Sequence, residues 1–315
     1  MLQRRGTVEV SIEDDGTNST LLIKGFFPLP QFIRYIKERC PPRCFDDPEL
    51  VAEWQEARAV ALTVINDEAG LADSIGVRKL SEEMKPLAEK VLQQPSMHRV
   101  VSLVPRQWCL VEIDRLVIFQ EAIDLPHIDQ IKASLSSSPS ARELIDLVSC
   151  SGSGAPPPVR CTPSDGGYMF SSASNDLRFL DVVTVEPDAI QDFTPVGAAS
   201  HAIVMYVGFS DNVVSATRSG DRIILTNGSH RVYALRELGF RYVPCLLTDA
   251  SDGNLSDFLL PAAVKQERQF YLSTPRPPLF KDYFDTRLTR QVPVIRKTSV
   301  LKAKLDLQKS SVPTA

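Results

Sequence analysis

One short segment, residues 222–247, constrains the fold of this chain more than any other. An apolar run at 223–225 predicts a buried strand. The run stops at Gly228, and the residue spacing that follows predicts a helix ending at Gly239, where a C-terminal cap belongs. A second apolar run, 242–247, comes directly after it. The sequence therefore predicts a strand, a tight turn, a helix and a strand, close to a β-α-β unit.

The predicted helix carries positive charge at the end where its dipole is already positive. If Asn227 is the N-cap, the backbone N–H groups of Gly228, Ser229 and His230 have no partner within the helix. Arg231 lies in the same turn, where a cation costs about 0.3 kcal/mol or more unless an anion is bound. Free N–H groups, a glycine and an Arg fork are what phosphate binding requires, so the turn is a candidate phosphate site.

A purely structural explanation of the same turn stays open. In this second interpretation Arg231 pairs with a nearby carboxylate such as Asp221, and the turn is only tight. Spacing alone does not separate the two interpretations.

The segment at 228–234, Gly-Ser-His-Arg-Val-Tyr-Ala, resembles the G-x-x-R-x-x-A signature of the ParB/sulfiredoxin-like superfamily. It is especially similar to the G-C-H-R version of sulfiredoxins and the D-G-H-H-R version of ParB-like free-serine kinases. In that superfamily the motif starts a helix and holds the phosphates of ATP or CTP. The resemblance extends upstream to 182–190 and downstream to Val243-Pro244, and it covers roughly residues 178–250.

The resemblance implies a nucleotide site for ATP or CTP, with Mg²⁺ accompanying the phosphates. The implied binding residues are Asn227, Gly228, Ser229, His230 and Arg231. The chain departs from the family pattern at two of them. Sulfiredoxins need a cysteine thiolate where this chain has Ser229, so sulfinic-acid reduction is not expected. The kinase version opens with an aspartate where this chain has Asn227.

Three functions from different classes follow from this resemblance. The first is a phosphotransferase acting on a small molecule or a protein, with His230, Arg231 and Glu186 as candidate catalytic residues. By region alone, other candidates for its general base are Asp176, Asp188 and Asp211. The second is a ParB-like, DNA-associated nucleotide switch, although no helix-turn-helix is apparent. The third is a scaffold that keeps the fold without chemistry.

The expected fold class is mixed α/β (α+β), a ParB/sulfiredoxin-like domain with an additional N-terminal α/β region. Composition suggests a boundary at 149–158, where a Gly/Ser stretch runs into three prolines. The expected segments are an N-terminal α/β region at 1–150, a linker at 151–165, the ParB/sulfiredoxin-like domain at 166–250 and a C-terminal extension at 251–315.

Hydrophobic periodicity predicts the remaining elements. Hairpins are expected at 7–26 and at 213–225, strands at 100–104, 109–119 and 292–295, and helices at 48–65, 71–93, 126–135, 141–149, 198–206 and 255–271. Glu112 and Asp114 lie two apart in one predicted strand, so their side chains share a face. They form either a paired-carboxylate site or a solvent-facing polar row.

Charge and cysteine usage limit the partners that the sequence predicts. The formal net charge is −4, but residues 276–315 hold 9 Lys/Arg against 3 Asp/Glu. This basic tail suggests contact with nucleic acid or an acidic partner, with a solvated extension as the alternative. Six scattered cysteines and four isolated histidines predict neither a disulfide framework nor a metal site. With no apolar run long enough to span a membrane, the expectation is a cytoplasmic protein.

Overall fold

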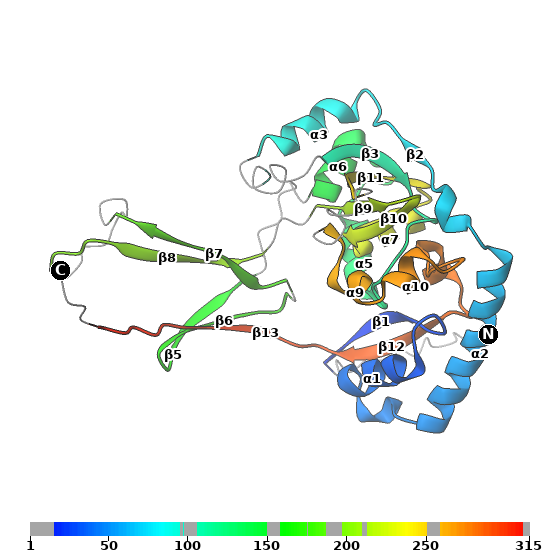
Figure 1. Cartoon of the computed structure of the whole chain (residues 1–315), viewed down its shortest axis with the longest axis horizontal. Helices are drawn as coiled ribbons and strands as arrows, with labels where there is room; N and C mark the ends of the chain where they lie inside the picture. The colour runs from blue at the N-terminus through cyan, green and yellow to red at the C-terminus, as the bar shows by residue number, and fades with distance from the viewer. Residues whose placement is uncertain are drawn as a thin grey trace, which may run out of the picture. The chain divides into compact units, whose positions relative to one another are not determined.

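The computed structural model shows a chain that divides into two compact units (Figure 1). The residues that it describes are 16–94, 97, 106–149, 158–174, 176–186, 197–209, 213–250 and 259–310. The first unit takes its described residues from Met1–Leu80, Arg106–Pro139 and Val214–Arg296, and the second from Ser81–Pro105, Ser140–Val213 and Lys297–Ala315. The segment expected to form the ParB/sulfiredoxin-like domain, 166–250, therefore contributes to both units.

The first unit contains two sheets with helices around them. Its strands are β1 (Thr17–Ile23), β2 (Val77–Arg78), β3 (Arg106–Glu112), β4 (Ala122–Asp124), β9 (Ser215–Ser219), β10 (Arg222–Asn227), β11 (Tyr242–Asp249) and β12 (Thr289–Ile295). Its helices are α1 (Leu29–Arg39), α2 (Asp47–Asp67), α5 (Leu125–Ala133), α7 (Ser229–Glu237), α9 (Ala262–Gln266) and α10 (Arg268–Leu272). Short 3₁₀ helices are η1 (Pro42–Cys44), η2 (Leu71–Ser74) and η4 (Phe280–Phe284). The strand orders are β10-β9-β11-β3-β2 and β12-β1-β4.

The five-stranded sheet carries the segment that dominates the sequence. β9 and β10 form an antiparallel hairpin that turns at Gly220, and β11 returns after α7 to pair in parallel with β9. β10 and β11 are therefore antiparallel and separated by β9. The expected strand, helix and strand are all present, but the β-α-β interpretation was wrong, because β9 lies between β10 and β11 and these two strands run in opposite directions.

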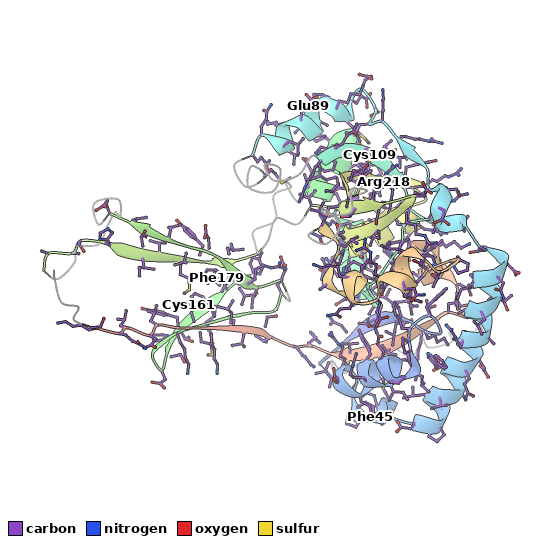
Figure 2. The ribbon with its side chains drawn as sticks, viewed as in Figure 1. Phe45, Glu89, Cys109, Cys161, Phe179 and Arg218 are labelled. Carbon is purple, nitrogen blue, oxygen red and sulfur yellow. The ribbon has the colours of Figure 1, made fainter. Side chains whose placement is uncertain are left out.

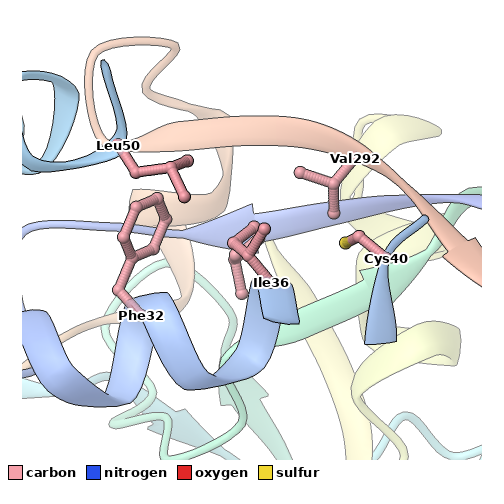
Figure 3. Close-up of a cluster of buried hydrophobic side chains, with 6 residues drawn as sticks. Phe32, Ile36, Cys40, Leu50 and Val292 are labelled. Atoms are coloured by element: carbon pink, nitrogen blue, oxygen red, sulfur yellow. The ribbon is translucent and has the colours of Figure 1, made fainter. Parts of the chain in front are cut away.

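The three-stranded sheet supports a separate hydrophobic core. One face of α1 packs on β1 and β12, and α2 packs against α1 (Figure 3). The buried cluster consists of Leu22, Phe32, Ile36, Cys40, Leu50 and Val292. The helix ends at Arg39, with Cys40 as its extended C-cap, because Pro41 and Pro42 cannot continue it.

The second unit is built from helices and two further sheets. Its elements are α3 (Met84–Leu92), α6 (Ala141–Ser149), β5 (Arg160–Ser164), β6 (Gly167–Ser172), β7 (Arg178–Val185), β8 (Ala202–Gly208) and β13 (Ser299–Lys304). The three strands β13-β6-β5 form one sheet, and β7 and β8 form a two-stranded ribbon. The helices α3 and α6 pack against each other.

Several sequence predictions are confirmed, beginning with the mixed α/β class. The helices expected at 48–65, 126–135 and 141–149 correspond to α2, α5 and α6. Asp46 caps α2 by accepting a hydrogen bond from the Glu49 amide at 3.2 Å. Within the described residues, no helix combines the length and apolar character needed to cross a membrane.

Two predicted helices were wrong. The segment 71–93 divides into η2, the short strand β2 and α3, because β2 joins the sheet beside β3. The segment 198–206 is largely strand β8, whose β-branched residues pair along β7. The predicted helix at 255–271 is only partly seen, as the two short helices α9 and α10. Residues 7–15 and 100–104 lie outside the described residues.

Both interpretations of Glu112 and Asp114, the paired-carboxylate site and the solvent-facing polar row, were also wrong. Glu112 is buried, and it accepts hydrogen bonds from the Gly76 amide and from the Arg241 guanidinium, each at 3.0 Å. These donors hold the pKa of the Glu112 carboxyl below its usual value, against the opposing effect of burial. Asp114 lies beyond β3 and pairs with Arg236 at 3.1 Å. Each carboxylate therefore has its own cationic partner.

Four of the nine Lys and Arg side chains of the predicted basic tail are neutralised inside the first unit. Arg276, Lys281, Arg287 and Arg290 each form an ion pair with a carboxylate. Lys302 and Lys304 are exposed on β13 in the second unit. The patch offered to an acidic partner is therefore smaller than the composition suggests.

Candidate functional site

The predicted phosphate turn lies between β10 and α7 in the first unit (Figure 1). β10 is buried at 222–225 and loses its regular register with β9 between Leu225 and Asn227. Gly228 follows in the left-handed conformation, with φ of 95°. This conformation favours glycine, and it lets the chain turn from strand into helix within one residue.

Gly228 is also required for space. A Cβ atom at this position would lie 2.6 Å from Val214 Cγ2 and 3.1 Å from Arg231 Nη2. The Arg231 guanidinium therefore folds back toward the turn that precedes its own helix. The Gly228 backbone and the Arg231 guanidinium, both named in the predicted phosphate turn, lie close together.

The N-cap of α7 is a glycine, which has no side chain to accept from the backbone amides of the first turn. Helical hydrogen bonding starts with the Val232 amide, which donates to the Gly228 carbonyl at 3.0 Å. The helix ends as expected, because Gly239 has φ of 89° and the Phe240 amide donates to the Leu235 carbonyl at 3.0 Å. The last turn of α7 is thus closed by backbone hydrogen bonds, whereas the amides of its first turn have no capping side chain to accept from them.

His230 is held as a neutral imidazole. Its Nε2 accepts a hydrogen bond from the Asp124 backbone amide at 3.1 Å, so the ring proton of the neutral form is on Nδ1. Burial, then the nearby His127 ring, lower the pKa of His230 to about 4. The two imidazoles meet edge to face, with ring centres 5.3 Å apart. This geometry favours His230 as a hydrogen-bond donor through Nδ1 rather than as a general base.

Asp124 fixes the position of its neighbours around the turn. Its carboxylate caps α5 by accepting from the His127 amide at 3.2 Å, and it also accepts from the Asn18 side-chain amide at 2.9 Å. The sequence predicted a helix at this place but not that the N-terminus of the helix meets His230. The Asp-Leu-Pro-His sequence was a usable signal for the cap. The contact between residues 124 and 230, which are 106 positions apart, had no signal in the sequence.

The helix entry is more enclosed than the sequence suggests. Ser229 and Arg231 are 5% and 6% exposed, while Asn227, Gly228 and His230 are partly buried. Two hollows among the described residues, of about 530 Å³ and 340 Å³, lie elsewhere. They are lined by residues of α1 and by residues around β5 and β6 respectively, and neither includes a residue of 227–231.

The predicted binding residues at 227–231 all lie in the first unit, whereas the residues named as catalytic come from both units. Glu186 belongs to the second unit, where it is exposed just after β7. Asp176 is in the second unit too, whereas Asp188 and Asp211 lie outside the described residues. The alternative pair of Arg231 with Asp221 is disfavoured, because Asp221 precedes β10 and the strand separates the two by about 20 Å.

The His230 geometry predicts a pH dependence of stability. The unfolded chain protonates this imidazole near pH 6.5 and the folded chain only near pH 4, so the unfolded state binds more protons between these values. Stability should therefore fall as the pH drops through this window. From pH 7 to pH 5 we expect His230 to contribute a loss of about 1–2 kcal/mol. Urea unfolding at both pH values should show that the His230→Gln variant loses less stability than wild type. Equal losses in both proteins would contradict the assignment.

No group of three or more His, Cys, Asp or Glu side chains suited to a metal ion occurs among the described residues. Comparisons with protein-family models, with curated proteins and with solved structures each returned no match.

Proposed function

We propose that this protein binds a nucleoside triphosphate, ATP or CTP, with its phosphates at the entry of α7. The supporting observation is a helix start that has no capping side chain, follows a left-handed glycine and carries an arginine folded toward that glycine. Helix amides and a guanidinium are the donors that phosphate oxygens accept from, and the helix dipole adds a favourable field.

Each residue of the turn has a role in this proposal. The amides of Ser229 and His230 donate to phosphate oxygens, and Gly228 lets the phosphate approach the backbone. The neutral His230 ring offers its Nδ1 proton, and Arg231 supplies the positive charge. Mg²⁺ accompanies the nucleotide and is held mainly by phosphate oxygens.

Phosphoryl transfer to a small molecule or protein is the reaction that such a site serves best, since it depends on positioning and charge neutralisation. Glu186 remains a candidate base by sequence region only. One observation favours a second function, a scaffold that keeps the fold without turnover: Ser229 and Arg231 are nearly buried. A DNA-associated switch has less support, because ion pairs neutralise four of the nine Lys and Arg side chains of the basic tail.

Calorimetric titration with ATP and with CTP, each with Mg²⁺, tests the proposal. We expect binding by wild type and a loss of affinity of about tenfold or more in Arg231→Ala, equivalent to one charge-assisted phosphate contact. Arg236→Ala is the matched control, because Arg236 lies in the last turn of α7 and pairs with Asp114. Circular dichroism establishes that each variant is folded.

The alternatives give different results in the same set of experiments. Binding without release of phosphate or transfer to an acceptor supports the scaffold. A gel shift with DNA that weakens steeply with salt supports the DNA-associated switch. Absence of binding by wild type to either nucleotide rejects the proposal.

A further inference from the structure

Among the described residues, β7 and β8 pair only with each other, so each strand of this ribbon has one outer edge without a strand partner. β8 pairs with β7 along one side, and no other described strand pairs with it. An unpaired strand edge is a template for another strand. A ribbon of two strands is also marginally stable by itself, and a third strand or a packed face is needed to secure it.

β8 lacks the features that normally protect an edge strand. Its sequence, Ala-Ile-Val-Met-Tyr-Val-Gly, contains no charge and no proline. β7, by contrast, carries Arg178 and Asp181 and contains a register shift between Phe179 and Asp181. Charges, prolines and bulges are the devices that block edge pairing, so β8 is the edge of this ribbon that favours association.

Apolar side chains are exposed on both faces of the ribbon. Ile203 is 64% exposed on one face, and Tyr206 is 50% exposed on the other. On the Ile203 face the pairing register adds Phe179 and Val182 from β7, each about half exposed. Figure 2 shows the Phe179 side chain on the ribbon. A strand that pairs with β8 must therefore be apolar on both of its faces.

We propose that β8 pairs antiparallel with β8 of a second copy of this chain. The twofold axis that relates the two strands passes between the two Met205 residues. The product is a four-stranded sheet in which the two β8 strands are central and the two β7 strands are at the edges. This association goes beyond the proposed nucleotide binding and is independent of it.

The sequence of β8 matches itself in this register. With Met205 opposite its own copy, Val204 lies opposite Tyr206 of the second copy, an aromatic and β-branched pair of the kind that stabilises sheets. Ile203 then lies opposite Val207, and the small residues Ala202 and Gly208 meet at the ends. All seven residues overlap without opposing a charge. Because an isologous contact uses the same patch twice, a second copy supplies the required partner strand.

Sedimentation velocity on the full chain over a range of concentrations tests the association. Wild type should form a dimer, and Met205→Lys should raise the dimer Kd by roughly tenfold or more, because two like charges then meet at the axis. Met205→Glu should have the same effect. An equimolar mixture of the two variants should restore the dimer, because a Lys then faces a Glu.

Val182→Lys is the matched control. Val182 pairs with Met205 on the same face but belongs to β7, away from the proposed contact. It should leave the dimer Kd within about threefold of wild type, since it opposes no charge across the axis. A dimer weakened equally by Val182→Lys would instead indicate stacking of ribbon faces and would overturn the edge pairing. A monomeric wild type, or a mixture of variants that fails to dimerise, would also overturn it.

Discussion

Arg276→Ala should lower the free energy of unfolding of the first unit by about 3–5 kcal/mol. The Arg276 side chain is completely buried and bonds to both oxygens of Asp282 at 2.5 and 2.6 Å. Its Nη2 also donates to Glu68 at 2.9 Å. Removal of the guanidinium leaves Asp282, itself buried, without a compensating charge. Urea unfolding followed by the fluorescence of Trp54 and Trp108, which both belong to this unit, measures the loss.

Two further variants test whether the loss of stability is specific to the buried Arg276–Asp282 pair or common to ion pairs in this protein. Arg287→Ala breaks an exposed pair with Asp285 and should cost at most about 1 kcal/mol. Arg276→Met combined with Asp282→Asn should recover part of the loss, because no unpaired charge remains, while the new side-chain carbonyl can still accept from the Leu279 amide. A loss from Arg276→Ala as small as that from Arg287→Ala would show that the buried pair contributes little.

Gly228→Ala should lower the free energy of unfolding by about 2–4 kcal/mol, from backbone strain and overpacking together. The backbone has φ of 95°, which an alanine adopts only under strain. The new methyl group would also lie 2.6 Å from Val214 Cγ2, and Val214 is buried with no room to move away. The same urea experiment measures the change.

Gly239→Ala is the matched control for the part of the loss that comes from backbone strain. Gly239 has φ of 89°, and no atom lies within 4 Å of the place that a methyl group would take, so only the strain of about 1 kcal/mol remains. A double-mutant cycle with Val214→Ala isolates the contact, and a coupling of about 0.5 kcal/mol or more is expected because the shorter side chain relieves the clash. Equal losses of unfolding free energy in the two variants would show that backbone strain alone explains the effect of Gly228→Ala.

Local sequence signals were reliable where one segment contained all of the required information. The apolar run at 223–225, the glycines at 228 and 239 and the spacing between them predicted β10, the turn and α7. Glycine at these two positions is a backbone requirement, as the positive φ values show. The start of α2 is also marked by local residues, namely the N-cap Asp46 and a proline in the first turn.

The β8 segment shows where local patterns fail. Residues 198–206 were predicted as a helix from their apolar spacing, but a short apolar run has no reliable period. Pairing with β7, which is about 20 positions away, decides the strand. Strand formation depends on a partner, and the identity of that partner is not encoded in the segment itself.

For the candidate site too, the sequence predicted the local features and missed those that depend on distant residues. The sequence named the turn and its five residues, but it did not name the Asp124 amide that fixes the His230 ring. It also placed Arg231 at an open helix end, whereas that side chain is nearly buried in the packed first unit. Burial is a property of the whole packed unit, so no local pattern reports it.

The sequence by itself determined the mixed α/β class, the glycine-bounded helix α7 and the donors gathered at its start, because these depend on backbone conformations and spacings within a few residues. Only the tertiary structure decided the insertion of β9 between β10 and β11, the burial of Arg276 against Asp282 and the neutral state of His230. Each of these depends on contacts between residues whose separation in the sequence carries no signal, or on the exclusion of water that such contacts produce.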